Sequence, residues 1–254
     1  MLSNQTINRL HQMKLTGMAQ ALVDQMEKTG FNDYSFEERL GLLVEYEWTY
    51  RQNKRLAILL KQAKLRLDAC MEDINYAHPR KLDRKLIKTL STCQWINAHH
   101  NVIITGPTGI GKTFIACALA NAACRLSFTA RYYRLPRLLQ DMALARADGT
   151  YHRVLSRLAK TDLLILDEWG MSPFNDTQSR DLLELVDDRH LLHSTIIVGQ
   201  IPLEHWHQLL GDPTVADAVM DRLVHNAHKI KLDGDSMRKI LAFDDSAPAS
   251  NEEK

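Results

Sequence analysis

A glycine-rich stretch near the middle of the chain has the residue types and spacing that bind a nucleotide phosphate. It fits the pattern G-x-x-x-x-G-K-[ST] at every required position, with an apolar strand signal before it and a helix signal after it. In such a loop the glycines let backbone N–H groups curve around the β-phosphate, the lysine reaches the β- and γ-phosphates, and the hydroxyl can bind Mg²⁺. The predicted ATP-binding residues are Gly106, Pro107, Thr108, Gly109, Ile110, Gly111, Lys112, Thr113 and Phe114.

A pair of carboxylates further along the chain supplies the other half of the expected chemistry. Asp167 and Glu168 directly follow the apolar run 163–166, which is typical of a buried strand in a parallel sheet. Ligands of parallel sheets bind at the carboxyl ends of the strands. We therefore predict that Asp167 and Thr113 hold Mg²⁺, and that Glu168 orients or deprotonates the attacking water. ATP could instead be bound without turnover, but the presence of Glu168 favours an ATPase.

A polar residue at the end of the next expected strand is a third candidate. Gln200 follows the expected strand at residues 195–199 and would emerge beside the same phosphates. It could sense the γ-phosphate or position water. Its alternative role is a hydrogen bond that simply closes the strand end.

The scaffold that must position these residues is an α/β fold. Strand and helix signals alternate after residue 97, and this alternation predicts a mainly parallel sheet covered by helices on both faces, as in P-loop NTPases. The expected strands lie at residues 102–105, 129–134, 163–167, 195–199 and 229–232.

The first part of the chain predicts helices instead. Apolar residues between positions 3 and 90 recur at intervals of three and four, and Ser35 with Glu38 forms the capping-box pattern of a helix expected to run through Trp48. His78-Pro79 is expected to break the helical run. We predict a small all-α N-terminal domain over residues 1–80, an ATPase domain over 81–243 and a disordered acidic tail over 244–254.

The amino-acid composition is ordinary for a globular protein and does not indicate a binding partner. The chain has 254 residues and a formal charge of +1, with 45% hydrophobic residues. The N-terminus lacks the apolar core of a signal peptide and no stretch is long enough to span a membrane, so we predict a cytoplasmic protein without membrane contact. The four cysteines form no C-x-x-C pair and are expected to be reduced packing residues.

Charge is nevertheless uneven along the chain. Residues 51–90 contain eleven lysines and arginines against four acids. Such a basic stretch could bind DNA phosphates, which would make affinity dependent on salt, or it could be a solvated helix face. The candidates for DNA contact here are Lys54, Arg55, Lys61 and Lys64.

Several stretches, in this order and spacing, resemble the AAA+ ATPases, and within them the helicase-loader branch that includes DnaC and the IstB transposition helpers of bacterial insertion sequences. The likeness is closest to IstB and covers nearly the whole chain. The stretches that carry it are 35–40, 47–48, 106–113, 163–170, 212–213, 221–223 and 234–238.

The resemblance implies roles for two arginines. Arg222 falls where the family has an arginine finger that reaches the ATP of a neighbouring subunit, and Arg238 falls at the second sensor position, which contacts the γ-phosphate within one subunit. Taken alone, either arginine could be a surface ion-pair residue. The chain departs from the loader pattern at Gln200, where asparagine is common. Few residues follow Arg222, so we expect a truncated or absent helical lid.

The resemblance also implies a DNA-binding element after the second strand. In this branch an extra helical element follows that strand and lines the DNA-binding face of the assembly. Arg131, Arg134 and Arg137 interleave with aromatic residues there and are candidates for DNA backbone contact. An ordinary strand with one polar and one apolar face would show the same alternation.

The function implied is that of an ATP-dependent DNA-binding transposition helper in a bacterial cell. Such a protein forms homo-oligomers on duplex DNA with ATP and Mg²⁺, recruits or regulates the transposase of the same insertion sequence, and disassembles on hydrolysis. One alternative is a DnaC-like loader of the replicative helicase. A second is a non-hydrolysing DNA-binding scaffold that uses ATP as a structural ligand.

Overall fold

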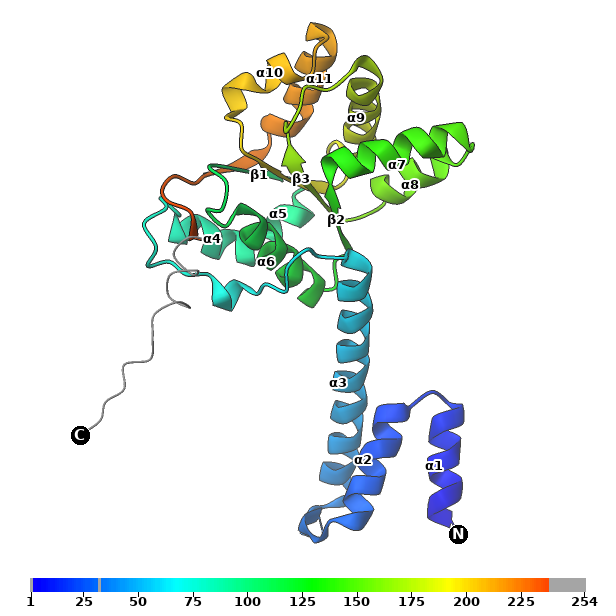
Figure 1. Ribbon diagram of the computed structural model, residues 1–254. Helices are drawn as coiled ribbons and strands as arrows, with labels where there is room; N and C mark the ends of the chain where they lie inside the picture. The colour runs from blue at the N-terminus through cyan, green and yellow to red at the C-terminus, as the bar shows by residue number, and fades with distance from the viewer. Residues whose placement is uncertain (1, 32, 238–254) are drawn as a thin grey trace, which may run out of the picture. The chain divides into compact units, whose positions relative to one another are not determined.

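The computed structural model describes residues 2–31 and 33–237, and the chain divides into two compact units, Met1–Ile58 and Leu59–Lys254 (Figure 1). The first unit is helical, as expected. Its elements are α1 (Leu2–Gln12), α2 (Thr16–Glu27), the short 3₁₀ turn η1 (Thr29–Phe31) and α3 (Phe36–Ala63), whose last turn belongs to the second unit.

The capping box at the start of α3 is present. The Glu38 backbone N–H donates to Ser35 Oγ at 3.2 Å, and the Ser35 N–H donates to Glu38 Oε2 at 2.7 Å. These two bonds satisfy backbone donors that a helix start leaves free. The helix then continues to Ala63, well past the expected end at Trp48. Because no glycine or proline interrupts positions 42–63, nothing in the local sequence stops it.

Residues 59–80 pack with the second unit, so the division between units comes earlier than the predicted boundary at residue 80. Ala63, Ala69 and Ile74 are buried. Buried Arg80 donates from Nη1 to the carbonyl of Ile110, inside the glycine-rich loop. This segment contains the 3₁₀ turn η2 (Met71–Asp73) and otherwise little regular structure before α4.

The second unit is built on a five-stranded parallel sheet. The strand order is β2-β3-β4-β1-β5, with all four neighbouring pairs parallel. All five carboxyl ends therefore meet at one edge of the sheet, as the predicted site requires. The strands are β1 (Asn101–Thr105), β2 (Ala130–Arg134), β3 (Leu163–Trp169), β4 (Ser194–Gly199) and β5 (Ala227–Lys231).

Helices cover both faces of this sheet (Figure 1). The apolar helix α6 crosses one face and packs against α4, while α7, α9 and α11 cover the other face above a core that includes Trp169 and Trp206. The predicted α/β P-loop NTPase fold is thus confirmed. The helices of this unit are α4 (Arg84–Ser91), α5 (Gln94–Asn97), α6 (Lys112–Arg125), α7 (Leu135–Ala147), α8 (Tyr151–Ala159), α9 (Asp176–Arg189), η3 (Leu203–His205), α10 (Trp206–Leu209) and α11 (Pro213–Val224).

The four cysteines are free thiols. Cys93, Cys117 and Cys124 are buried and Cys70 is half-buried. Burial raises the pKa of the Cys93 and Cys124 thiols to about 11, so both stay protonated near neutral pH. Within residues 2–31 and 33–237, no helix is long and apolar enough to cross a membrane.

Candidate nucleotide site

The glycine-rich loop joins β1 to α6 at the carboxyl edge of the sheet. Gly111 precedes α6 with φ 97°, and Gly106 leaves β1 with φ 151°. A Cβ atom on Gly106 would lie 2.4 Å from the Leu232 carbonyl oxygen, and one on Gly111 would lie 2.4 Å from Arg80 Nη1. Both positions therefore require glycine for conformation and for space. The loop places its backbone N–H groups at the N-terminus of a 14-residue helix, which favours bound anions.

Lys112 and Thr113 occupy the first turn of α6. The Lys112 ammonium donates to the carbonyl oxygens of Gly106 and Pro107, both at 2.8 Å, so the lysine lies across the mouth of the loop. Phe114, next along the helix, is half-buried. A phosphate bound in the loop would give the ammonium charged oxygens in place of these carbonyls.

Thr113 and Asp167 meet although they are far apart in the sequence. The Thr113 hydroxyl donates to Asp167 Oδ2 at 2.8 Å, and the Asp167 side chain is only 5% exposed. Hydroxyl and carboxylate oxygens are the ligands that Mg²⁺ prefers, and this ion is commonly held by few protein groups together with substrate phosphates. The residues present therefore fit a magnesium–nucleotide complex.

Tyr132 is a site residue that the sequence did not reveal as one. It lies on β2, and its buried hydroxyl donates to the same Asp167 Oδ2 at 2.6 Å. Burial and the bond to Asp167 both raise the pKa of Tyr132, so the hydroxyl keeps its proton and remains a donor. Two hydroxyl groups thus orient one carboxylate, an arrangement that commonly tunes metal ligands.

We predict that Tyr132→Phe weakens magnesium use specifically. The variant leaves Asp167 oriented by Thr113 alone, so the Mg²⁺ concentration needed for half-maximal ATP turnover should rise by about tenfold or more. Phosphate release measured over a magnesium titration checks this. Tyr133→Phe is the matched control, because neighbouring residues of a strand point to opposite faces. An unchanged magnesium dependence for Tyr132→Phe would remove this role.

Glu168 is held by two arginines. Its backbone has φ 65° and lies in the register shift of β3 between Leu166 and Trp169. Arg134 Nε donates to Oε2 at 2.8 Å, and Arg66 Nη1 donates to Oε1 at 3.1 Å. Arg66 was not predicted. It lies in the loop after α3, and no local sequence pattern links it to a residue 102 positions away.

Gln200 lies where the sequence placed it, directly after β4 and exposed. It lines a cleft together with Gly106 and Pro107 of the loop and with Lys229 and Lys231 of β5. The side chain is therefore near the start of the loop, and its predicted sensor role stays a prediction.

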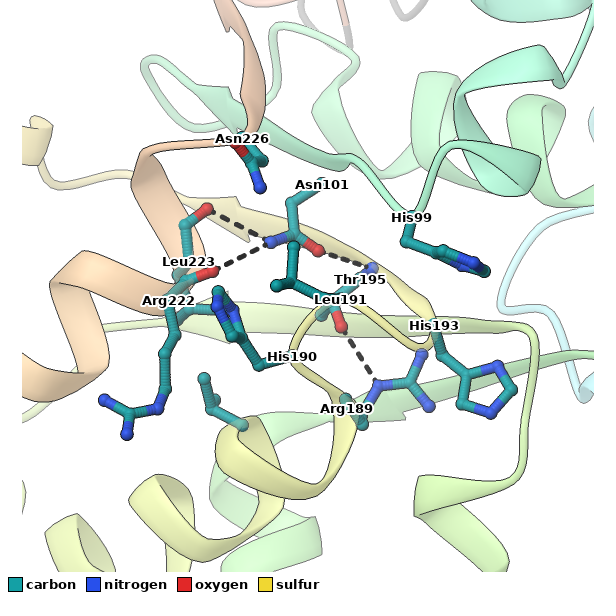
Figure 2. Close-up of a pocket in the computed structure, with 11 residues that line it drawn as sticks. His99, Asn101, Arg189, His190, Leu191, His193, Thr195, Arg222, Leu223 and Asn226 are labelled. Carbon is teal, nitrogen blue, oxygen red and sulfur yellow. Dashed lines mark hydrogen bonds between the residues drawn. The ribbon is translucent and has the colours of Figure 1, made fainter.

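Arg222 lies at the other end of the sheet, where β1 begins, and not at the carboxyl ends of the strands where the loop lies. Asn101, the first residue of β1, donates from Nδ2 to the carbonyls of Arg222 and Leu223, both at 3.3 Å (Figure 2). The loop follows the last residue of β1, roughly 13 Å away along the strand. The guanidinium of Arg222 bonds to Asp187 Oδ1 at 2.6 Å and to the Ala218 carbonyl at 3.0 Å. Arg222 is thus remote from the nucleotide loop of its own subunit.

Arg189 and Arg222 both line a small pocket near the start of β1 (Figure 2). This buried arginine donates to backbone carbonyls, among them those of Leu158, Thr161 and Ser194, and to Thr195 Oγ1. Burial lowers the pKa of Arg189 to about 9. Its partners join the end of α8 to the starts of β3 and β4, which indicates a structural role.

Arg238 and the tail 244–254 lie outside the described residues, as does the part of the chain where a lid would follow. The last described residue, Met237, is bonded to the loop, because its N–H donates to the Gly109 carbonyl at 3.0 Å. The residues shortly before Met237 also contact the segment around Arg80, because the Asp233 N–H donates to the Arg80 carbonyl at 3.2 Å. Lys81 Nζ lies 2.6 Å from Asp233 Oδ2.

The predicted DNA-contact residues fall in separate places. Lys54 and Arg55 are exposed on α3 in the first unit. Lys61 and Lys64 are exposed in the second unit, at the end of the same helix and directly after it. The remaining three lie on β2 and in the first turn of α7, where Arg131, near the start of β2, lines a different hollow from Arg134 and Arg137. Those three are the half-buried Arg131 and the exposed Arg134 and Arg137.

Comparison with known proteins gives one family for nearly the whole chain. Residues 8–242 match the family described as IstB-like ATP binding protein. An insertion sequence ATP-binding protein of Sinorhizobium fredii is 47% identical over 94% of this chain and 98% of its own length. An ATP-binding protein in an insertion sequence of Mycobacterium tuberculosis is 32% identical over 91% of this chain and 92% of its own.

Solved structures show the same fold at low identity. The DnaC helicase loader superimposes with a TM-score of 0.55 at 15% identity, over 67% of this chain and 99% of that one. The AMPPCP-bound DnaA of Aquifex aeolicus gives a TM-score of 0.57 at 18% identity, over 75% and 58%. This likeness shows that the second unit shares its α/β fold with these two proteins.

Proposed function

The chain belongs to the IstB-like ATP-binding proteins of insertion sequences, and from this premise we propose that it is an ATP-hydrolysing, DNA-bound helper of transposition. The observation that carries the proposal is the meeting of Thr113, Asp167 and the glycine-rich loop at one edge of the sheet. A site with these groups can bind ATP with Mg²⁺ and can place a carboxylate, that of Glu168, beside it.

The chain's own residues then have distinct tasks. The loop's N–H groups and Lys112 hold the phosphates, while Thr113 and Asp167 hold the metal. Magnesium, when bound with ATP, neutralises phosphate charge. Glu168 accepts a proton from the attacking water as that water adds to the γ-phosphorus. ADP leaves with the bridging oxygen, and the products are ADP and phosphate.

A complete site requires a second subunit in this proposal. Arg222 lies at the edge of the sheet opposite its own loop, so it can serve only the nucleotide of a neighbour. A head-to-tail interface in which each subunit presents Arg222 to the next has this geometry. Arg238 and Gln200 would contact the γ-phosphate within one subunit. Loss of that phosphate on hydrolysis removes a bridge across the interface and favours disassembly.

DNA and the transposase are the proposed partners, and the bacterial cytoplasm is the proposed location. The basic candidates on α3, directly after it, on β2 and in the first turn of α7 would contact the duplex backbone. The all-α N-terminal part would provide DNA or partner contacts. Assembly on target DNA with ATP would mark a site for the transposase of the same insertion sequence.

The test is the particle mass of the full chain with duplex DNA and ATP, ADP or no nucleotide. We expect large assemblies with ATP and duplex, which decay as phosphate is released. A protein that stays monomeric on duplex but assembles with a replicative helicase or on single strands would be a loader instead. Assembly with ATP that never decays, with no phosphate released, would indicate the non-hydrolysing scaffold.

A further inference from the structure

A hollow of about 260 Å³ opens beside the first residues of β2, at the end of that strand away from the nucleotide site. β2 is an edge strand, so the hollow lies at the free edge of the sheet. The last turn of α3 and the end of α8 supply its other walls. We call it the basic hollow, and its lining includes Leu59, Gln62, Ala130, Arg131, Arg157 and Lys160.

The positive charge of the basic hollow is not neutralised by the described part of the chain. Three cations line it, and among the described residues no carboxylate does. Within residues 2–31 and 33–237, the side chains of Arg131, Arg157 and Lys160 form no ion pair or hydrogen bond. Asp162 is close in sequence, but its Oδ2 already accepts from the N–H and the hydroxyl of Thr129, at 2.8 and 2.7 Å. The three cations therefore remain available to an anion.

The shape and lining of the hollow strengthen this charge. Leu59 and Ala130 are buried, at 8% and 2% exposure, and make part of the lining apolar. Charges in a concavity with low-dielectric walls produce a stronger field than the same charges on a flat, hydrated surface. Lys160 directly follows α8, three positions after Arg157, so the two side chains lie on one side of the helix end.

The donors present match a phosphodiester group. A guanidinium can bond two phosphate oxygens at once, and an ammonium binds a phosphate as a point charge. Gln62 adds an amide that can donate to an oxygen. The nucleotide loop follows the carboxyl end of β1, at the far end of the parallel sheet, so the phosphates of bound ATP do not reach this hollow. A phosphate of the DNA backbone has the required charge and is accessible from outside the chain.

The basic hollow is separate from the candidate DNA contacts near the nucleotide site. Arg131 and Arg134 are three positions apart on β2, so their side chains point to opposite faces of the strand. Their Cα atoms are about 10 Å apart. Arg134 bonds to Glu168 at the carboxyl end of β3, whereas Arg131 lies beside the end of α8. One phosphate therefore cannot bind both arginines.

We propose that the basic hollow binds one backbone phosphate of duplex DNA, held by Arg131, Arg157 and Lys160. This inference rests on the proposed function as a DNA-bound helper. It adds Arg157 and Lys160 to the residues that bind DNA, and it divides the arginines of β2 and α7 between two points on the duplex. Phosphate contacts carry no sequence information, so this site fixes how the chain lies on DNA and does not select a sequence.

The experiment measures binding of the full chain to a fluorescent duplex over a series of salt concentrations, with Mg²⁺ and a non-hydrolysable ATP analogue. Arg157→Gln should weaken the affinity by about tenfold, equally on duplexes of unrelated sequence. Arg157→Gln combined with Lys160→Gln should also reduce the slope of log affinity against log salt by about one, because one phosphate contact is lost. The affinity for the ATP analogue should stay at the wild-type value.

Arg153→Gln is the matched control. Arg153 is exposed on α8, one turn before Arg157, and it does not line the basic hollow. The substitution removes the same charge from the same helix, so it should leave both the affinity for duplex and the salt slope unchanged.

A double variant tests whether two arginines bind the same phosphate. Arg131→Gln combined with Arg157→Gln should lose less affinity than the product of the two single losses, because each single change already disrupts the shared contact. Arg131→Gln combined with Arg137→Gln acts on two separate phosphates and should lose the full product. Arg131 is half-buried, so if its variants fail to fold, the exposed Arg157 and Lys160 still decide the outcome.

Three results would overturn the assignment of the hollow. The first is a wild type that binds duplex while the Arg157 and Lys160 variants keep its affinity and its salt slope. A lower melting temperature with unchanged DNA affinity would assign these cations to the carboxyl end of α8, which positive charge stabilises. A loss of affinity confined to single strands would assign the hollow to single-stranded DNA. A wild type that binds no duplex with any nucleotide would instead refute the proposed DNA-bound function.

Discussion

Glu168→Gln should reduce ATP turnover by about 10²–10⁴-fold while ATP binding persists. The amide keeps the size of the side chain and can still accept a hydrogen bond, but it cannot take a proton from water. Because the loop, Lys112 and the Thr113–Asp167 pair are untouched, the variant should bind ATP with Mg²⁺ and assemble on DNA without disassembling. Steady-state phosphate release and nucleotide titration measure the two effects separately.

The control for this variant is Glu45→Gln, an exposed position on α3 in the first unit. Glu45→Gln makes the same chemical change as Glu168→Gln, but in the first unit and outside the nucleotide site, so it should keep wild-type turnover. If Glu168→Gln kept wild-type turnover, Glu168 would not be the base. Another group, or a non-hydrolysing role, would then have to be considered.

Arg222→Ala should reduce turnover by about 10³–10⁵-fold in an assembly whose ATP sites lie between subunits. The guanidinium would stabilise the charge that develops on the γ-phosphate of a neighbour. Its present partners are Asp187 and the Ala218 carbonyl, at the edge of the sheet opposite the loop. Asp187→Asn is the matched control, because it removes the same ion pair and leaves the guanidinium available. It should keep most of the activity.

Mixing two inactive variants tests whether Arg222 acts between subunits. Arg222→Ala retains an intact loop and Glu168, and Glu168→Gln retains Arg222. An interface that takes the loop from the first variant and the arginine from the second is complete. Random mixing in equal amounts should restore about a quarter of wild-type turnover if subunits meet head to tail. No recovery, with mixed assemblies verified by mass, would show that the arginine has no such role.

The sequence by itself determined the loop, the carboxylate pair and the elements that carry them. A glycine-rich phosphate loop is a local motif, since its conformation depends on glycine at fixed positions next to a strand and a helix. The apolar run before Asp167 likewise predicted a buried strand, and Ser35 with Glu38 predicted a helix start. Each of these signals spans only a few residues, and the structure has each element where it was expected.

Only the tertiary structure decided which distant side chains meet at the site. Tyr132 reaches Asp167, and Arg134 reaches Glu168, because β2 pairs with β3 in a register that sets Arg134 opposite Asp167. Strand order and register depend on the packing of the whole sheet, so a short stretch of sequence does not predict them. Arg66 contacts Glu168 from the irregular segment after α3, and this segment has no periodic pattern from which the contact could be predicted. Arg222 is remote from its own loop for a tertiary reason as well. It packs at the start of β1, whereas the loop follows the end of β1, so the length of the strand separates them.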